Sequence, residues 1–239
     1  MDKRRSKNNN KSKNVSCETF FSYNYECEIV SRETNIMYIP TKIQEIVKDL
    51  EYTKDDIGRS KDIVFYYEDK YILKISDNKE EIYKEKEIND WLIQYIPGSK
   101  SIVFIEENNK YYYLRTLIKG ENLISERILS KPETLINILV DIIDILKSLD
   151  DKNCPYNSNT VGNNFVHGDL CLPNILVDEE NNFVGFVDLG NAGKGDRWYD
   201  YAWMMWSLEY NLHTDKYNKI LLNKLNIEFD KETYQEYTR

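Results

Sequence analysis

A polar loop followed at once by a short β-hairpin limits the folds open to this chain. The segments read, in order, FVHGDLCLPN at residues 165–174, ILVD at 175–178 and FVGFVD at 183–188. Gly168 and Pro173 interrupt any helix, so Asp169 and Asn174 belong to a loop. The two apolar segments form a hairpin that brings Asp188 back beside this loop. We therefore expect two carboxylates and one amide oxygen to converge.

These three side chains match the ligands that Mg²⁺ prefers, because the ion takes oxygen ligands and keeps waters or substrate phosphates in its shell. One carboxylate is left over to orient a hydroxyl group. Each of these residues taken singly also has an ordinary structural explanation. Asp169 caps a turn, Asn174 satisfies a loop and Asp188 ends a strand, and His167 is more simply explained as a structural residue than as a catalytic base. The hypothesis of a site depends on their joint occurrence.

A lysine inside an apolar strand supplies the second half of the pattern. Residues 62–67 (DIVFYY) and 71–76 (YILKIS) predict a hairpin with Lys74 in its second strand. Lys74 either faces solvent on a half-exposed sheet or reaches a nucleotide phosphate, steadied by a carboxylate. Glu85 on the following helix offers that carboxylate, although most acidic residues there are simply solvated. Together with the loop, these residues fit a phosphotransferase site.

The remaining elements are expected to change from strands to helices along the chain. A capping-box pattern at Thr41 and Gln44 predicts the start of a helix. Two strands are expected within 101–123, and apolar periodicity predicts a helix from 132 to 149. A further helix is expected at 79–96, with a buried side formed by Ile82, Ile88, Trp91, Leu92 and Tyr95. Nearer the C-terminus, residues 198–200 are expected to fasten the next helix, and the core is expected to include Trp203, Met204 and Trp206.

The composition excludes some classes of function. With a net charge of -9, the chain lacks the basic surplus of a general nucleic-acid binder. No apolar run approaches the roughly 20 residues needed to span a bilayer, so no membrane segment is expected. The four cysteines show no CxxC spacing and no signal peptide precedes them, which favours a cytoplasmic protein. Residues 1–36 begin with a basic, Asn-rich stretch and are expected to be a disordered leader, either merely solvated or an interaction tail.

The segment FVHGDLCLPNILVD, followed by VGFVDLGNAGKGDRWYDYAW, resembles the catalytic segment of the aminoglycoside 3'-phosphotransferases, a branch of the protein-kinase-like fold. A weaker resemblance runs through residues 37–155, where YILKIS, YKEKEINDWL, LIKG and LDDKNCPY occur in the family's order. The resemblance implies an α+β, two-lobed fold with a small β-rich N-lobe and a reduced, mainly helical C-lobe. The implied parts are the leader at 1–36, a nucleotide-binding N-lobe at 37–116, a hinge at 117–120 and a catalytic C-lobe at 121–239.

The same resemblance implies roles for five residues. Asp169 corresponds to the catalytic aspartate that orients the acceptor hydroxyl and accepts its proton. Asn174 and Asp188 correspond to the Mg²⁺ ligands. Lys74 corresponds to the lysine that binds the α- and β-phosphates of ATP, and Glu85 to its ion-pair partner.

Four further positions follow from the resemblance. Ser60 falls in the loop that covers the nucleotide, where backbone N–H groups meet the phosphates. Backbone groups of Leu117 and Ile118 match the hinge that binds adenine. Lys194 matches a basic position near the transferred phosphate, where its charge would stabilise that group.

Two departures from the family concern the acceptor. Only eight residues, NSNTVGNN, separate CPY at 154–156 from FVHGD, where the family has a helical segment that walls the acceptor pocket. The sequence also ends at YQEYTR, before the acidic helix end that contacts the acceptor amines in the family. We expect ATP- and Mg²⁺-dependent phosphorylation of a cationic small molecule, an aminoglycoside antibiotic of the 3' type, which confers resistance. A kinase of another small hydroxylated metabolite and an inactive nucleotide-binding remnant are the alternatives.

Overall fold

The computed structural model describes residues 37–55, 62–149 and 153–239, so the predicted leader lies outside the described residues. The first half is rich in strands and contains α1 (Thr41–Val47), β1 (Tyr52–Lys54), β2 (Ile63–Tyr67), β3 (Tyr71–Ser76), α2 (Lys79–Leu92), β4 (Ser101–Glu107) and β5 (Lys110–Thr116). The second half begins with β6 (Glu121–Asn122), α3 (Glu126–Leu129), α4 (Pro132–Ser148), β7 (Asn164–Val166) and the 3-10 helix η2 (Leu172–Asn174). It continues with β8 (Ile175–Val177), β9 (Phe183–Phe186), the 3-10 helix η3 (Leu189–Asn191), β10 (Gly193–Gly195), α5 (Arg197–Leu212), α6 (Lys216–Leu225) and α7 (Lys231–Tyr237).

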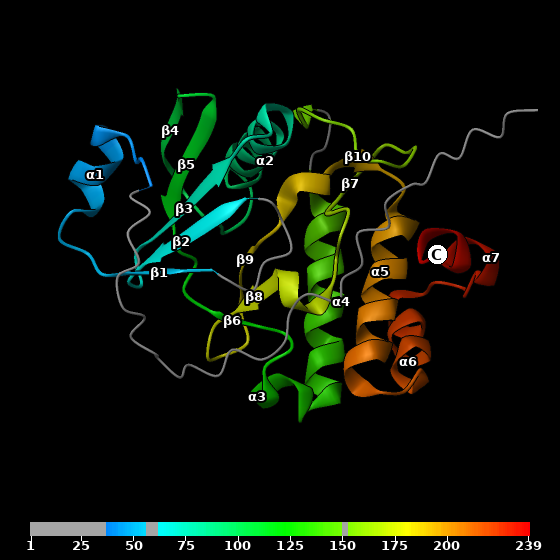
Figure 1. Cartoon of the computed structure of the whole chain (residues 1–239). Helices are drawn as coiled ribbons and strands as arrows, with labels where there is room; N and C mark the ends of the chain where they lie inside the picture. The colour runs from blue at the N-terminus through cyan, green and yellow to red at the C-terminus, as the bar shows by residue number, and fades with distance from the viewer. Residues whose placement is uncertain (1–36, 56–61, 150–152) are drawn as a thin grey trace, which may run out of the picture.

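An antiparallel sheet forms the first lobe, with the strand order β1-β2-β3-β5-β4 (Figure 1). Leu73 and Ile75 of β3 belong to an apolar cluster that also contains Ile43 and Val47 of α1. Because side chains alternate across a strand, Lys74 lies on the other face of the sheet. That face is turned toward α2 and the second lobe, so Lys74 is not on the solvent side.

The helix at residue 41 is confirmed, but the predicted capping box is wrong. Pro40 is the N-cap residue, and no side chain caps the helix. Gln44 instead donates from Nε2 to the backbone oxygen of Ile39, at 2.6 Å. Pro40 suits this position because its ring fixes φ and the missing N–H is not needed before the first turn.

Helix α2 ends at Leu92, four residues earlier than the predicted end at residue 96. Four of the five residues predicted for its buried side are buried, but Tyr95 is 45% exposed. Beyond Leu92 the chain turns more tightly, with the N–H of Gln94 donating to Trp91 and that of Tyr95 to Leu92, and Pro97 disfavours the helical conformation of Ile96. Tyr95 lies beyond the helix, with its ring centroid 5.3 Å from that of Trp91.

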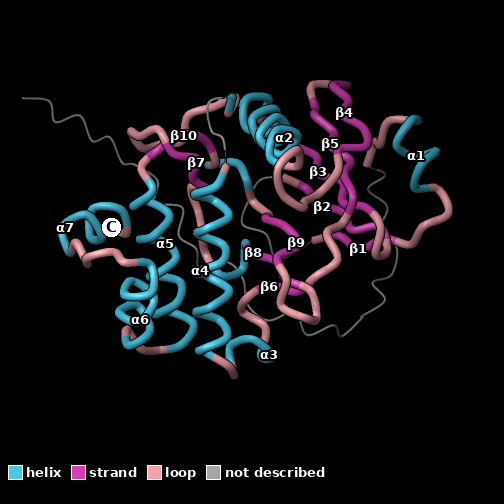
Figure 2. The backbone as a smooth tube through the Cα atoms, turned by 180° about the vertical axis from the view of Figure 1, so that it is seen from behind, coloured by secondary structure: helices cyan, strands magenta, loops and turns pink. Residues whose placement is uncertain are grey.

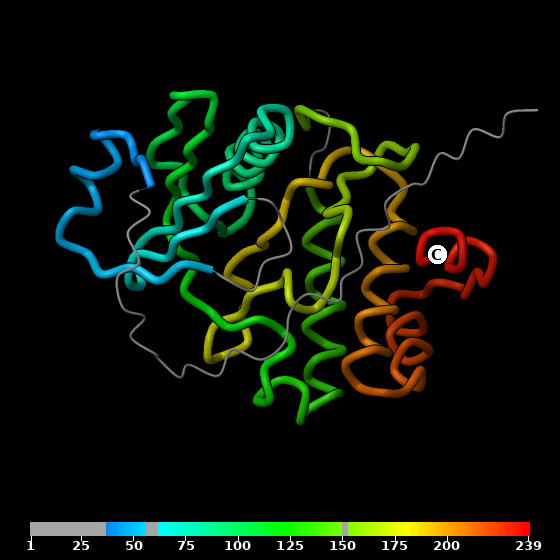
Figure 3. The backbone as a smooth tube through the Cα atoms, viewed as in Figure 1, coloured from blue at the N-terminus to red at the C-terminus, as the bar shows by residue number. Residues whose placement is uncertain are grey.

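Helices dominate the second lobe, where α4 lies beside α5 and α5 beside α6 and α7 (Figure 2). The inner side of α4 is buried from Leu135 to Leu146 against residues of α5 and α6. The small sheet β6-β8-β9 lies between this helical layer and the large sheet, and the second small sheet, β10-β7, lies against α4 and α5 (Figure 3). None of the described helices is long and apolar enough to cross a membrane.

Candidate active site

Asp200, near the start of α5, fixes the loop that contains His167 and Asp169. Its two carboxylate oxygens accept hydrogen bonds from the backbone N–H of His167 at 2.8 Å and of Gly168 at 2.9 Å. Burial raises the pKa of Asp200 to about 7, and the two N–H groups oppose that rise. Asp200 therefore joins α5 directly to the loop, beyond its predicted role of fastening the helix.

His167 has the geometry of a structural residue. It is fully buried, and its Nε2 atom lies 3.0 Å from the backbone oxygen of Val187. Burial lowers the pKa of His167 to about 4, so the ring is neutral and Nε2–H donates to that oxygen. The histidine thus ties the loop to the end of the β8–β9 hairpin.

Asp169, Asn174 and Asp188 converge as the sequence predicts. Asn174 donates from Nδ2 to the backbone oxygen of Asp169 at 2.9 Å and to its Oδ2 atom at 3.1 Å. The N–H of Val187 donates to the backbone oxygen of Asn174 at 3.0 Å, which brings Asp188 alongside. Burial raises the pKa of Asp169 to about 7, and the negative charge of Asp188 adds to this rise.

The donor set at this point fits Mg²⁺. Because Nδ2 of Asn174 makes both hydrogen bonds, its Oδ1 atom is left as a buried acceptor without a hydrogen-bond partner among the described residues. Asp188 supplies a carboxylate, and the backbone of this residue is in the left-handed region, with φ of 61°. The described ranges contain no group of three or more His, Cys, Asp and Glu side chains arranged to hold a metal. An ion held by Asn174 and Asp188 would therefore complete its shell with waters and phosphate oxygens, as Mg²⁺ usually does.

Lys74 is held by two carboxylates on the inner face of the sheet. Its Nζ atom lies 2.7 Å from Oε2 of Glu85 and 3.1 Å from Oδ2 of Asp62. Burial disfavours the charged form of Lys74 and so lowers its pKa, but the negative charges of Glu85 and Asp62 have the larger, opposite effect. The pKa of Lys74 is therefore raised above its ordinary value. Arg115 of β5 adds a second cation, with its NH1 atom 2.9 Å from Oε1 of Glu85.

Asp62 and Arg115 were not identified from the sequence. Arg115 lies in the apolar run YYYLRT, so it carried the same signal as Lys74 in YILKIS. Asp62 carried none, because it precedes its strand among other polar residues. Helix α2, which carries Glu85, packs against η3, which follows Asp188, so the two clusters are neighbours. Burial and the charge of Glu85 raise the pKa of Asp188, and the charges of Lys74 and Arg115 oppose this rise.

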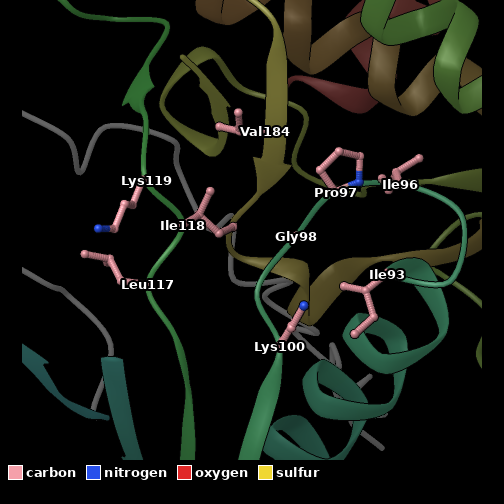
Figure 4. Close-up of a pocket in the computed structure, with 9 residues that line it drawn as sticks. All are labelled: Ile93, Ile96, Pro97, Gly98, Lys100, Leu117, Ile118, Lys119 and Val184. Atoms are coloured by element: carbon pink, nitrogen blue, oxygen red, sulfur yellow. The ribbon is translucent and has the colours of Figure 1, made fainter. Parts of the chain in front are cut away.

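The hinge residues line a pocket beside the polar cleft. The N–H of Leu117 donates to the backbone oxygen of Lys70 at 2.8 Å, whereas no described backbone oxygen accepts from Ile118. The pocket has a volume of about 360 Å³ and shares no residue with the Lys74 and Asp188 clusters (Figure 4). Its lining consists of Ile93, Ile96, Pro97, Gly98, Lys100, Leu117, Ile118, Lys119 and Val184. Of the two predicted hinge residues, only Ile118 therefore keeps its N–H available to a nucleotide base.

Lys194 lies in β10, and no hydrogen bond or ion pair within the described ranges joins its ammonium group to Asp169 or Asp188. Its role near the transferred phosphate stays a prediction. Its backbone instead binds the short segment before β7, donating to Tyr156 at 2.9 Å and accepting from Ser158 at 2.8 Å. The shortened segment therefore lies along β10, held by these hydrogen bonds.

Ser60, predicted to lie in the loop that covers the nucleotide, is outside the described residues.

Comparison with known proteins gives a consistent result. Residues 163–237 match the Phosphotransferase enzyme family. The chain is 26% identical over 227 residues to the probable aminoglycoside 3'-phosphotransferase of Lactococcus lactis subsp. lactis (strain IL1403), over 77% of this chain and 86% of that protein. It is 23% identical over 250 residues to the aminoglycoside 3'-phosphotransferase of Niallia circulans, over 84% of this chain and 95% of that protein.

A solved structure shows the same architecture. The aminoglycoside phosphotransferase APH(3'')-Id from Streptomyces rimosus ATCC10970 superposes with a TM-score of 0.71 at 18% identity, over 82% of this chain and 93% of that chain. The fold is the two-lobed, protein-kinase-like fold expected from the sequence, and the molecule is a phosphotransferase with a hydroxyl group as acceptor. Residues 163–237 thus match the Phosphotransferase enzyme family, and the chain is similar over most of its length to aminoglycoside phosphotransferases.

Proposed function

We propose that this protein transfers the γ-phosphoryl group of ATP to a hydroxyl of an aminoglycoside, in a Mg²⁺-dependent reaction that confers resistance to the antibiotic. One observation carries the proposal. The unpartnered Oδ1 atom of Asn174 lies in the cluster of Asp169 and Asp188, which faces the Lys74–Glu85 ion pair. The names of the relatives support the acceptor class and the 3' position.

The residues divide the reaction between them. The carboxylate of Asp169 orients the acceptor hydroxyl and takes its proton as the hydroxyl oxygen bonds to the γ-phosphorus. The bond from that phosphorus to the bridging oxygen breaks, and ADP leaves with its charge near Lys74. Asn174 and Asp188 would hold Mg²⁺, which when bound neutralises phosphate charge. The backbone N–H of Ile118 is the donor available to the base.

An assay of ADP release tests the proposal. Purified protein with Mg²⁺ and ATP is given a panel of aminoglycosides, and Asp169→Asn is compared with Asp144→Asn, a surface aspartate of α4 paired with Lys147. Turnover is expected with at least one aminoglycoside. Loss of the general base lowers kcat by about 10²- to 10⁴-fold in Asp169→Asn, whereas Asp144→Asn keeps full activity. No turnover with a folded protein on the whole panel contradicts the proposed function.

A second candidate is a kinase of another small hydroxylated metabolite. It is favoured by the segment before β7, where Asn157 forms a bridge with Lys194 instead of leading into a pocket wall. Gly162 in this segment approaches the backbone of Gly195 so closely that an added Cβ would lie 2.1 Å from its oxygen. ADP release with a neutral polyol or amino alcohol, and none with aminoglycosides, would select this candidate.

A further inference from the structure

Lys74 has one more acidic partner than the proposed reaction uses. Besides Oε2 of Glu85 at 2.7 Å, its Nζ atom contacts Oδ2 of Asp62 at 3.1 Å. The side chain of Asp62 is 10% exposed and that of Lys74 is 12% exposed, so water screens this second contact little. Lys74 is the only cation that pairs with Asp62 among the described residues. The proposed chemistry leaves this carboxylate without a role.

The two acidic partners of Lys74 differ in how they are held. Glu85 binds Arg115 through its other oxygen, Oε1, at 2.9 Å, so it keeps a cation whatever Lys74 does. Asp62 has no second cation in the described part of the chain, and it stands just before β2. An ammonium group has three N–H donors, and two of them face these carboxylates. Asp62 is therefore the partner that another anion can replace while the Glu85–Arg115 pair stays intact.

The charges of this cluster balance when the site is empty. Lys74 and Arg115 supply two positive charges, and Glu85 and Asp62 supply two negative ones. A surplus cation at a buried position is costly, and a carboxylate partner removes that cost. A phosphate that binds Lys74 brings further negative charge beside the carboxylate of Asp62, and like charges around one ammonium group repel each other. Asp62 and a nucleotide phosphate thus compete for the same cation.

We propose that Asp62 is an internal competitor of the nucleotide, which holds Lys74 while the site is empty and so weakens the binding of ATP and ADP. The inference rests on the proposed function, in which Lys74 binds the phosphates of ATP, and adds a built-in limit on nucleotide affinity. When only a fraction of the protein has Lys74 released, the apparent affinity is reduced by that fraction. Weaker binding of ADP also lets the product leave sooner.

Calorimetric titration of Asp62 variants tests the competition. Asp62→Asn removes the charge at nearly constant size, so the Kd for Mg·ATP is expected to fall about tenfold. The Kd for adenosine, which carries no phosphate, stays unchanged. Asp62→Glu keeps the charge and remains close to the unmodified protein. If Asp62 only supported the fold, its loss would damage the site and raise the Kd for Mg·ATP instead.

A matched control separates the local contact from the change in net charge. Asp77→Asn makes the same charge change in the same lobe, at an exposed ion pair with Lys110 that has an N···O distance of 2.6 Å. Both Kd values are expected to stay unchanged in this variant. An equal fall of the Kd for Mg·ATP in Asp77→Asn and Asp62→Asn overturns the competition, because net charge alone would then explain it.

These titrations contain no acceptor, which separates the inference from the proposed function. Tighter binding of Mg·ATP in Asp62→Asn, by a protein that releases no ADP with any aminoglycoside, supports the competition and contradicts the function. Turnover with an unchanged Kd for Mg·ATP in Asp62→Asn overturns the competition and leaves the function standing. The competition is also overturned when neither the folded unmodified protein nor Asp62→Asn binds Mg·ATP.

Discussion

At the scale of single residues, Glu85 holds two cations on the inner face of the large sheet. One of its oxygens binds Lys74 and the other binds Arg115. Burial opposes the ionised form of Glu85, but these two cations outweigh burial and lower its pKa. Glu85 therefore stays negative and keeps a partner when Lys74 turns toward a phosphate, because Arg115 remains bound to it.

We predict that Arg115→Met lowers the free energy of unfolding by about 1.5–3 kcal/mol, since a hydrogen bond to a buried charge is lost. Chemical denaturation measures the change. The matched control is Lys79→Met, because Lys79 pairs with Glu106 on the surface and an exposed ion pair contributes about 0–1 kcal/mol. Equal losses in the two variants would show that Glu85 does not depend on Arg115.

At the scale of elements, the loop that contains Asp169 fits closely against η3. Gly168 has a φ of 79°, and an added Cβ would lie 2.3 Å from the backbone oxygen of Asn191. A side chain is therefore excluded twice, by the backbone conformation and by the neighbouring peptide. This close approach explains why the glycine stands beside Asp169.

Gly168→Ala is predicted to move the loop, so that kcat falls at least tenfold and stability decreases by roughly 1–2 kcal/mol from the left-handed φ alone. Gly190→Ala is the matched control in η3, because an added Cβ there meets nothing within 4 Å. Steady-state kinetics and thermal unfolding of the two variants check the prediction. A fully active Gly168→Ala would mean that Asn191 gives way at no cost.

Local patterns in the sequence predict most of these elements. The hairpin of β2 and β3 and the helix α4 follow from alternation and from the 3.6-residue period, which act over neighbouring residues. The cap of α1 was missed because Pro40 takes that position, and the end of α2 was missed because residues 93–96 turn without continuing the α-helix. Arg115 was missed although it stands in an apolar strand as Lys74 does, and Asp62 was missed because no local pattern marks a carboxylate outside its strand. Trp203 and Trp206 were predicted to be core because an aromatic residue on a helix is usually core, but both are half-buried.

At the scale of the whole molecule, the buried His167 makes stability depend on pH. Its pKa in the folded protein is lowered to about 4 by burial, against an ordinary value of 6.5. Between pH 6.5 and 4 the unfolded chain therefore binds a proton that the folded protein does not. The contribution of His167 to stability is complete above pH 6.5 and falls by roughly 3 kcal/mol as the pH drops to about 4.

His167→Gln is predicted to lose this acid sensitivity while it retains an N–H donor for Val187. Denaturation at a series of pH values from 7 to 4 measures the slope of stability in each protein. Asp200, with a pKa of about 7, takes up a proton in the folded state and works in the opposite direction, but it does so in both proteins and cancels in the comparison. Identical slopes would place the acid sensitivity elsewhere.

Helix α5 has two sides that differ in what they hold. Asp200 on one side holds the backbone of the loop that contains Asp169, while Trp206 and Tyr210 stack on one another elsewhere on the helix. Substitutions at Trp206 or Tyr210 leave both hydrogen bonds of Asp200 in place. The outer surface of α5 can therefore change by single mutations during evolution while the position of the Asp169 loop is kept.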